Sequence, residues 1–336
     1  CGLDAALRTR GKSILGILLL GKNGQLGWEF QRTLATLGEV VALDYPEIDL
    51  AEPESLRPQI RAAFGVSNSI NILVNASAYT AVDRAESQPA LATAINAQAP
   101  AVMAEEAARA GALLLHYSTD YVFDGQKGSA YNESDATHPL NTYGASKLAG
   151  EGAIQEVAQA LSGAFLIFRT SWVYSLQRES FVSKVLQWSR TQKILHLVTD
   201  QISGPTWARL LAEISTQALA LAFSQPDPIA WLQERRGLYH LAGSGWASRK
   251  EWGEEILKLH PHRDEIITEQ ILPALTAEFP TPAQRPLFSA LDCTRFSRVF
   301  GLQLPPWQTG LLLATSGAGA VAPNSSTQPA KGISST

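Results

Sequence analysis

The sequence predicts an α/β protein in which a doubly wound parallel sheet is followed by a smaller C-terminal α/β domain. Two observations support this prediction. Short, continuously apolar runs alternate with amphipathic helical stretches through the first half of the chain, and a glycine-rich turn follows the first apolar run. Strands that are apolar on both faces are typical of parallel sheets buried between two layers of helices.

The elements of the first half can be assigned in order from these patterns. We expect strands at the apolar runs 14–20, 40–43, 71–75, 112–118 and 164–170. The amphipathic stretches between them predict helices at 25–37, 53–64, 90–110 and 142–160. A fold of this kind binds ligands beyond the carboxyl ends of its strands, so the loops after these runs are expected to carry the site.

The second half has a looser pattern of the same type. Helical stretches at 179–190, 207–223 and 249–258 and an apolar run at 237–243 predict the smaller α/β domain. Residues 314–336 are small, polar and rich in Pro, Gly and Ser, which predicts a disordered tail because such a segment buries too little apolar area to offset its ordering entropy. At the other end, residues 1–12 are expected to form an irregular extension.

Composition excludes several classes of protein. The 336-residue chain has a net charge of −4 and no run of basic residues, which argues against nucleic-acid binding. Its two cysteines cannot form a disulfide framework, so we expect a reducing cytoplasm. The apolar run 14–20 is too short to span a bilayer, so no membrane association is expected. The six histidines show no metal-ligand spacing, so no metal is expected.

The turn after the first predicted strand points to a dinucleotide. Gly21, Gly24 and Gly27 form a G-x-x-G-x-x-G pattern between a strand and a helix. Glycines let backbone amides approach a pyrophosphate, and the helix adds its positive dipole end. We therefore assign residues 13–172 to a Rossmann-type NAD(P)-binding domain, to which some later segments return, and 173–313 mainly to a substrate-binding domain.

The choice between NADPH and NADH stays open. Asp44 ends the second predicted strand, where a carboxylate can accept hydrogen bonds from an adenosine ribose and favours NADH, although it could equally be a turn aspartate. Asp49 could contact the adenine or merely cap a turn. No arginine that could pair with a 2′-phosphate closely follows the second strand, so neither cofactor is excluded.

Two further segments carry side chains suited to ketone reduction. Thr119 and Asp120 follow the strand at 112–118, and Tyr143 and Lys147 lie one helical turn apart in NTYGASKLAGE. A lysine ammonium beside a phenol is expected to lower the phenol pKa. In this interpretation Thr119 polarises a carbonyl, Tyr143 supplies the proton and Lys147 also holds the nicotinamide ribose. The alternative is that Tyr143 and Lys147 are solvated i,i+4 neighbours.

The glycine turn, Thr119 and Tyr143-x-x-x-Lys147 resemble the extended short-chain dehydrogenase/reductase superfamily. Within it, the chain resembles the dTDP-4-dehydrorhamnose reductase family in segments that run from Gly21 to Gly310: GKNGQLGWEF, NASAYTAVDRAE, HYSTDYVFDG, PLNTYGASKLAGE, FRTSWVY, PTPAQRP and PWQTG. The resemblance implies NADPH- or NADH-dependent reduction of the 4-keto group of dTDP-4-dehydro-L-rhamnose, the last step to dTDP-L-rhamnose.

The resemblance also implies binding residues. The cofactor's pyrophosphate would contact Gly24, Gln25 and Leu26. Its adenosine half would contact Asp44, Asp49 and Leu50. Its nicotinamide side would contact Ala78, Tyr79 and Thr80. The sugar and the diphosphate would be met by Thr119, Asp120, Trp172 and Arg285. Each of three residues also has a simpler interpretation without a ligand: Ala78 as a small residue that permits close approach, Trp172 as a core aromatic residue, and Arg285 as a surface arginine.

Departures from the family pattern leave alternatives open. Ser180 stands where the family often has asparagine, and Gln284 replaces an arginine. Some members dimerise around a metal held by glutamates; Glu29 fits one such position but Arg209 occupies another, which leaves a homodimer open and argues against a metal-bridged one. A 4,6-dehydratase would need an acid where Tyr121 stands. Another nucleotide-sugar epimerase or reductase, or a non-catalytic subunit like that of methionine adenosyltransferase, is the remaining alternative.

Overall fold

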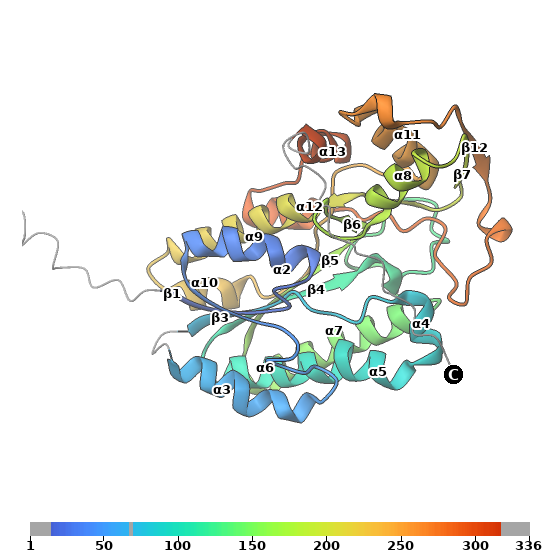
Figure 1. The fold of residues 1–336 in the computed structure, drawn as a ribbon. Helices are drawn as coiled ribbons and strands as arrows, with labels where there is room; N and C mark the ends of the chain where they lie inside the picture. Colours follow the sequence, from blue (N-terminus) through green and yellow to red (C-terminus); the bar gives the residue numbers. More distant parts are fainter. Residues whose placement is uncertain (1–14, 67–69, 317–336) are drawn as a thin grey trace, which may run out of the picture.

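The computed structural model describes residues 15–66 and 70–316, and its centre is one six-stranded sheet (Figure 1). All its strand pairs are parallel, and the strand order is β2-β1-β3-β4-β5-β10. The strands are β1 (Leu15–Leu20), β2 (Gly38–Leu43), β3 (Ile70–Asn75), β4 (Leu113–Thr119), β5 (Ala164–Thr170) and β10 (Gly237–His240). The predicted fold class is confirmed.

Strand β1 shows why the sheet is doubly wound. Ile17 and Leu19 pack into one apolar cluster, whereas Leu18 and Leu20 pack into another on the opposite face. All four side chains have no exposed surface. Burying one such side chain stabilises the fold by about 1.5–3 kcal/mol, so a strand that is apolar on both faces requires helices on both sides.

Two helix layers supply these clusters, and Figure 1 shows them above and below the sheet. One layer contains α2 (Gln25–Thr33), α9 (Ala208–Phe223), α10 (Pro228–Glu234) and α12 (Thr294–Phe300). The other contains α3 (Leu56–Val66), α6 (Ala99–Arg109) and α7 (Thr142–Leu161). The short helices α4 (Val82–Ser87) and α5 (Pro89–Thr93) precede α6.

The helix predicted at 90–110 is interrupted. Residues Ala94–Gln98 form a π-helical turn between α5 and α6. Pro100, the second residue of α6, lacks the N–H that a continuous α-helix would use. The turn holds the buried Asn96, whose side chain accepts from the Tyr79 N–H at 2.8 Å and donates to the Tyr79 carbonyl at 3.0 Å. The irregular turn therefore fixes the loop that follows β3.

A second lobe lies beside the carboxyl ends of the strands. Its apolar cluster includes Tyr174, Trp252, Trp307 and Leu311. It is built from α8 (Phe181–Ser189), α11 (Arg249–Leu259), α13 (Trp307–Ser316) and three two-stranded sheets formed by β6 (Val173–Tyr174) with β9 (Thr206–Trp207), β7 (Ile194–Val198) with β12 (Gln270–Ala274), and β8 (Ile202–Ser203) with β11 (Ala247–Ser248).

Three boundary findings complete the fold. Residues 314–316 belong to α13, with Ala314 buried, so the tail expected from 314 does not begin there. The rest of that tail and the extension 1–12 lie outside the described residues.

Strand β10 returns from the second half of the chain to pair with β5. Within 15–66 and 70–316, no helix combines the length and apolar character that a membrane crossing needs.

Candidate active site

A cavity of about 810 Å³ opens at the carboxyl ends of β1, β3 and β4. This is the point where the strand order reverses, because β2 and β3 lie on opposite sides of β1. Doubly wound sheets bind ligands at such a switch point. The lining includes the glycine turn, the loop after β3, the end of β4, the start of α7 and residues of the second lobe.

The glycine turn forms the end of this cavity nearest β1. Gly21 has φ +89°, and a Cβ there would lie 2.8 Å from the Ser77 backbone nitrogen. A Cβ on Gly27 would lie 1.9 Å from the Gly21 carbonyl oxygen. Helix α2 begins at Gln25, and its N-cap Gly24 brings no side chain to satisfy the first backbone N–H groups. This arrangement fits a bound pyrophosphate, since a helix N-terminus without a side-chain cap offers free donors.

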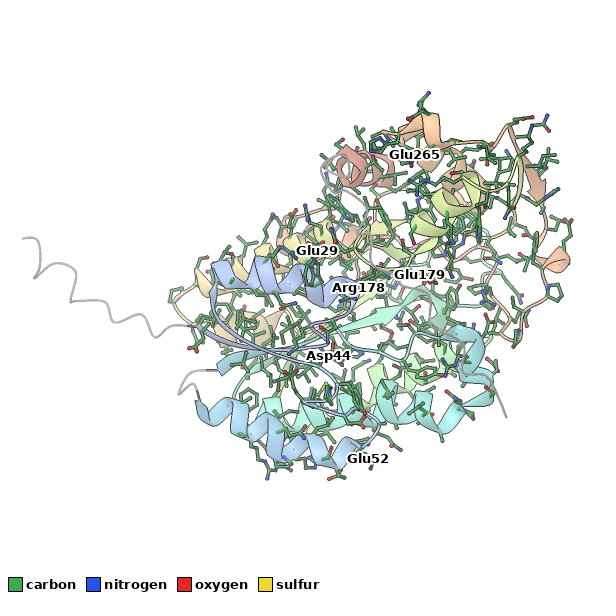
Figure 2. All side chains as sticks on the ribbon, viewed as in Figure 1. Glu29, Asp44, Glu52, Arg178, Glu179 and Glu265 are labelled. Atoms are coloured by element: carbon green, nitrogen blue, oxygen red, sulfur yellow. The ribbon has the colours of Figure 1, made fainter. Side chains whose placement is uncertain are left out.

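Asp44 lies beside this turn and also lines the cavity. Its two carboxylate oxygens accept from the Asn23 and Tyr45 backbone N–H groups, each at 2.8 Å. The carboxylate is thereby held in place with acceptor capacity left for a ribose. Figure 2 labels Asp44 together with Arg178, an exposed residue of the second lobe that lines the same cavity.

Only some of the predicted cofactor residues line the cavity. Gly21, Gly24, Gln25, Leu26, Ala78 and Thr80 line the cavity. Asp49 lies outside the lining and accepts from the Ala51 N–H at 2.9 Å, as a turn aspartate does. Leu50 belongs to the core, and the Tyr79 hydroxyl donates to Gln88 at 2.6 Å. A contact between Asp49, Leu50 or Tyr79 and the cofactor stays a prediction.

The three predicted catalytic residues line one cavity. Thr119 is the last residue of β4, and Tyr143 and Lys147 lie in the first two turns of α7. The N-cap Asn141 fixes the start of α7, because its side chain accepts from the Gly144 N–H at 2.8 Å. The Thr119 hydroxyl donates to Asp120 Oδ1 at 3.2 Å and accepts from the Tyr121 N–H at 3.1 Å.

The expected acidification of Tyr143 by Lys147 is wrong for this structure. Burial raises the pKa of Tyr143 well above its ordinary value, and the influence of the Thr119 hydroxyl lowers it only in part. The Lys147 amine instead donates to the Tyr117 carbonyl at 2.6 Å. Burial therefore sets the direction of the pKa shift, Lys147 is not among its causes, and Tyr143 is a protonated phenol at neutral pH.

Behind Lys147 runs a buried chain of hydrogen bonds that sequence reasoning missed. Asn75 Oδ1 accepts from the Ser77 backbone N–H at 3.1 Å, so Asn75 Nδ2 faces His116 Nδ1 at 3.0 Å. Neutral His116 then carries its proton on Nε2, which lies 3.1 Å from Lys147 Nζ.

This sense of hydrogen bonding favours an uncharged Lys147 amine as the acceptor. Burial acts in the same direction and lowers the pKa of Lys147 to about 8, opposed by the charge of Glu151. Burial also lowers the pKa of His116 well below its ordinary value. His116 is fully buried, as a packed core residue would be, but its ring also contacts the predicted catalytic lysine.

A buried ion pair lies next to these residues. Arg169 on β5 donates to both oxygens of Glu151 on α7, at 2.8 and 2.6 Å, and Ser118 donates to the same carboxylate. The two charged side chains are only 5% and 1% exposed. The pair fixes α7 against β5, and with it the position of Tyr143. The only signal for this pair in the sequence is Glu151 itself, an acidic residue one helical turn after Lys147.

Asp120 is held by the second half of the chain. Its Oδ2 accepts from Ser203 at 3.0 Å and from Ser289 at 2.5 Å. Burial raises the pKa of Asp120 to about 6, and the hydrogen bonds from the two serines and Thr119 oppose this. Asp120 lines the cavity, and its contact with the sugar stays a prediction.

Trp172 lines the same cavity in an unusual backbone conformation. Its φ is +42°, which is an outlier for a bulky side chain. Its ring stacks on Trp252, with centroids 5.4 Å apart and planes at 15°. The guanidinium of Arg249 lies over its ring at 3.6 Å. Arg249 was not anticipated from the sequence.

A second cavity of about 650 Å³ adjoins the first, with Phe181 and Arg249 lining both. Arg285 lies in this second cavity. Its guanidinium donates to the two oxygens of Asp83 at 3.0 and 2.7 Å and also to the Ala283 carbonyl at 2.8 Å. A contact between Arg285 and a diphosphate stays a prediction.

A parallel doubly wound sheet, an uncapped glycine turn at its switch point and a Thr–Tyr–Lys set in one cavity define a Rossmann-fold oxidoreductase of the extended short-chain dehydrogenase/reductase type. The family model described as the RmlD substrate binding domain matches residues 15–316. A dTDP-4-dehydrorhamnose reductase from Burkholderia thailandensis is 40% identical over 295 residues, covering 87% of this chain and 95% of the relative. The chain belongs to the dTDP-4-dehydrorhamnose reductase family.

Solved structures agree with this assignment. A dTDP-4-dehydrorhamnose reductase from Clostridium acetobutylicum superposes with a TM-score of 0.79 at 29% identity, covering 91% of this chain and all of that one. The corresponding reductase from Bacillus anthracis, in complex with NADP, gives a TM-score of 0.76 at 30% identity and covers 89% of this chain and 97% of its own.

Proposed function

We propose that the protein reduces the 4-keto group of dTDP-4-dehydro-L-rhamnose to give dTDP-L-rhamnose, using NADPH or NADH. The product is a precursor for cell-surface polysaccharide. The observation that carries the proposal is that Thr119, Tyr143 and Lys147 line one cavity with the glycine turn, in a chain whose relatives include reductases of this name. The reductase from Bacillus anthracis, which was solved with NADP, supports the cofactor class.

The bound nicotinamide would supply a hydride to the keto carbon. Tyr143 would donate the proton to the keto oxygen, and its raised pKa keeps that proton on the phenol until the oxygen becomes basic. The Thr119 hydroxyl, which lines the same cavity as Tyr143, would hold the same oxygen. Lys147 would contact the nicotinamide ribose and stabilise the phenolate that remains.

The remaining predicted contacts follow from the positions of the residues. Asp120 and Trp172 line the first cavity and would hold the sugar. The second cavity is lined by Phe181, Trp188 and Phe279, and these rings would suit a thymine base. We assign residues 13–172, with the returning β10, to cofactor binding and 173–313 mainly to substrate binding.

The structure bears on two rival functions. Tyr121 lies in the cavity where a dehydratase would need an acid, and its ring contacts Tyr143 edge-on with centroids 5.9 Å apart. This supports reduction over elimination. A regulatory subunit without catalysis would not need Thr119, Tyr143 and Lys147 to line one cavity with the glycine turn.

The assembly and the location of the protein are also part of the proposal. Arg209 lies 3.2 Å from the Glu29 carboxylate, so a cation of the chain itself occupies the place beside this glutamate. This supports a homodimer without a bridging metal, if one forms. The low cysteine count supports a cytoplasmic location.

The test is the oxidation of NADPH and of NADH, followed at 340 nm, with dTDP-4-dehydro-L-rhamnose as substrate. Turnover with release of dTDP-L-rhamnose is expected. Tight cofactor binding by folded protein without turnover of this substrate would overturn the proposal and favour the regulatory alternative.

A further inference from the structure

The side chain of Arg249 is the cation that the two adjoining cavities share. Arg249 is the first residue of α11, and its position is fixed twice: Ser248 and Glu251 form a capping box around it, and its N–H donates to the Gln201 carbonyl at 3.2 Å. The guanidinium lines the first cavity and the second. A rigid helix end therefore presents this charge at their junction.

Aromatic rings hold the flat faces of the guanidinium. Its carbon lies 3.6 Å from the Trp172 ring centroid, 5.0 Å from that of Phe181 and 5.6 Å from that of Trp252. Stacking of this kind orients the group but leaves its N–H donors at the edges. Those donors lie in one plane, as needed to bind two oxygens of a phosphate at once.

Arg249 also lacks a carboxylate partner within the described part of the chain. Burial lowers its pKa, and its charged or polar neighbours are the Tyr121 hydroxyl, the Asp120 carboxylate and Arg285. Asp120 is already bound by Ser203 and Ser289. A partly buried cation without a carboxylate is costly unless an anion joins it.

The other cations of the two cavities differ. Lys184 is paired with Glu179 at 2.8 Å, and Arg285 is paired with Asp83. Lys147 donates to a backbone carbonyl. Arg178 is exposed and lines only the first cavity. Arg249 is thus the one cation in the linings that is both shared by the cavities and without a carboxylate among residues 15–66 and 70–316.

We propose that Arg249 binds the diphosphate of the nucleotide-sugar substrate where the two cavities meet. The proposal rests on the proposed function, which puts the sugar in the first cavity and the nucleoside in the second. The diphosphate joins these two parts of the substrate and must therefore lie at the junction of the two cavities, which Arg249 lines. Arg285, with its donors directed at Asp83, would act from further away.

The test compares Arg249→Gln and Arg249→Lys with Lys250→Gln, a control at the next residue, whose ammonium pairs with Glu254. Dissociation constants for dTDP and for thymidine are measured by titration calorimetry, which needs no turnover, and NADPH binding is measured by fluorescence. Arg249→Gln should weaken dTDP about 10- to 100-fold, as expected for a charge-assisted contact. Arg249→Lys should lose less, and Lys250→Gln should change nothing.

Thymidine has no phosphate, so its binding distinguishes the loss of a phosphate contact from general damage to the site. Thymidine and NADPH should bind all four proteins equally if Arg249 meets only the diphosphate. Equal weakening of dTDP and thymidine, or weaker NADPH binding with unchanged dTDP binding, would overturn the proposal. If wild-type protein binds dTDP but reduces no keto-sugar, the proposed function fails while the assignment of Arg249 is still measured. If Arg249→Gln does not fold, Arg249→Lys gives the result.

Discussion

Replacing Lys147 by methionine should make the protein less active, and the stability of the variant relative to wild type should be higher at pH 7 than at pH 10. Lys147 is 2% exposed, and burial lowers its pKa from 10.5 to about 8. One pKa unit corresponds to about 1.4 kcal/mol, so keeping the ammonium charged in the folded state costs about 3 kcal/mol. Methionine has a similar length and no charge.

The sign of the pH dependence follows from linkage. Below pH 8, lysine is protonated in both states, and the folded wild type bears the whole cost. Between pH 8 and 10.5 the folded state loses the proton first, so the wild type gains stability relative to the variant. Lys147→Met leaves the Tyr117 carbonyl without its donor, which costs about 1–3 kcal/mol at every pH. The difference between the proteins should therefore shift by about 3 kcal/mol with pH, most of it by pH 10.

Urea unfolding at pH 7, 8, 9 and 10 measures this shift, because groups other than residue 147 cancel in the difference. Lys184→Met is the control, since its ammonium is half-exposed and its difference from wild type should not follow the same curve. A difference between wild type and Lys147→Met that is constant within about 1 kcal/mol would show that Lys147 is not a buried amine with a low pKa.

Three further predictions concern the site and its support. Tyr143→Phe should lose about 100- to 10,000-fold in turnover while NADPH binding is unchanged, and full activity would remove Tyr143 as the proton donor. Arg169→Met should lower the free energy of unfolding by about 3–5 kcal/mol because it leaves the Glu151 carboxylate buried without its paired cation, and a loss under 1 kcal/mol in urea would contradict this. Gly27→Ala should lower the thermal midpoint and weaken NADPH binding because its Cβ would overlap the Gly21 carbonyl oxygen. Gly152→Ala in α7, with nothing within 4 Å of the added Cβ, should be neutral or stabilising, and equal effects of the two changes would refute the steric argument.

The strands and the glycine turn could be predicted because their signals are local. The apolar run at 164–170 coincides with β5, and the run at 112–118 differs from β4 by one residue. Position 21 requires glycine because its φ is positive and the neighbouring backbone leaves no room for a Cβ. Both are properties of the turn itself. Tyr143 and Lys147 share one helix, so their spacing placed them near one site.

The partners of these residues could not be predicted because they come from distant segments. His116 meets Lys147 only because β4 lies under α7, and Arg169 meets Glu151 across β5 and α7. The direction of the Tyr143 pKa shift depends on burial, which a sequence does not state. Nothing in the sequence distinguishes Arg249, because its place depends on two cavities that meet at its side chain.

The return of β10 to the sheet has a consequence for protein engineering. A fragment ending near residue 172 would expose the β5 edge that β10 covers, and with it a row of unpaired backbone groups prone to aggregation. It would also strip α9 from α2 and leave their shared apolar face in water. The nucleotide-binding half therefore cannot be excised as a module, and chimaeras within this family should exchange the returning segment along with it.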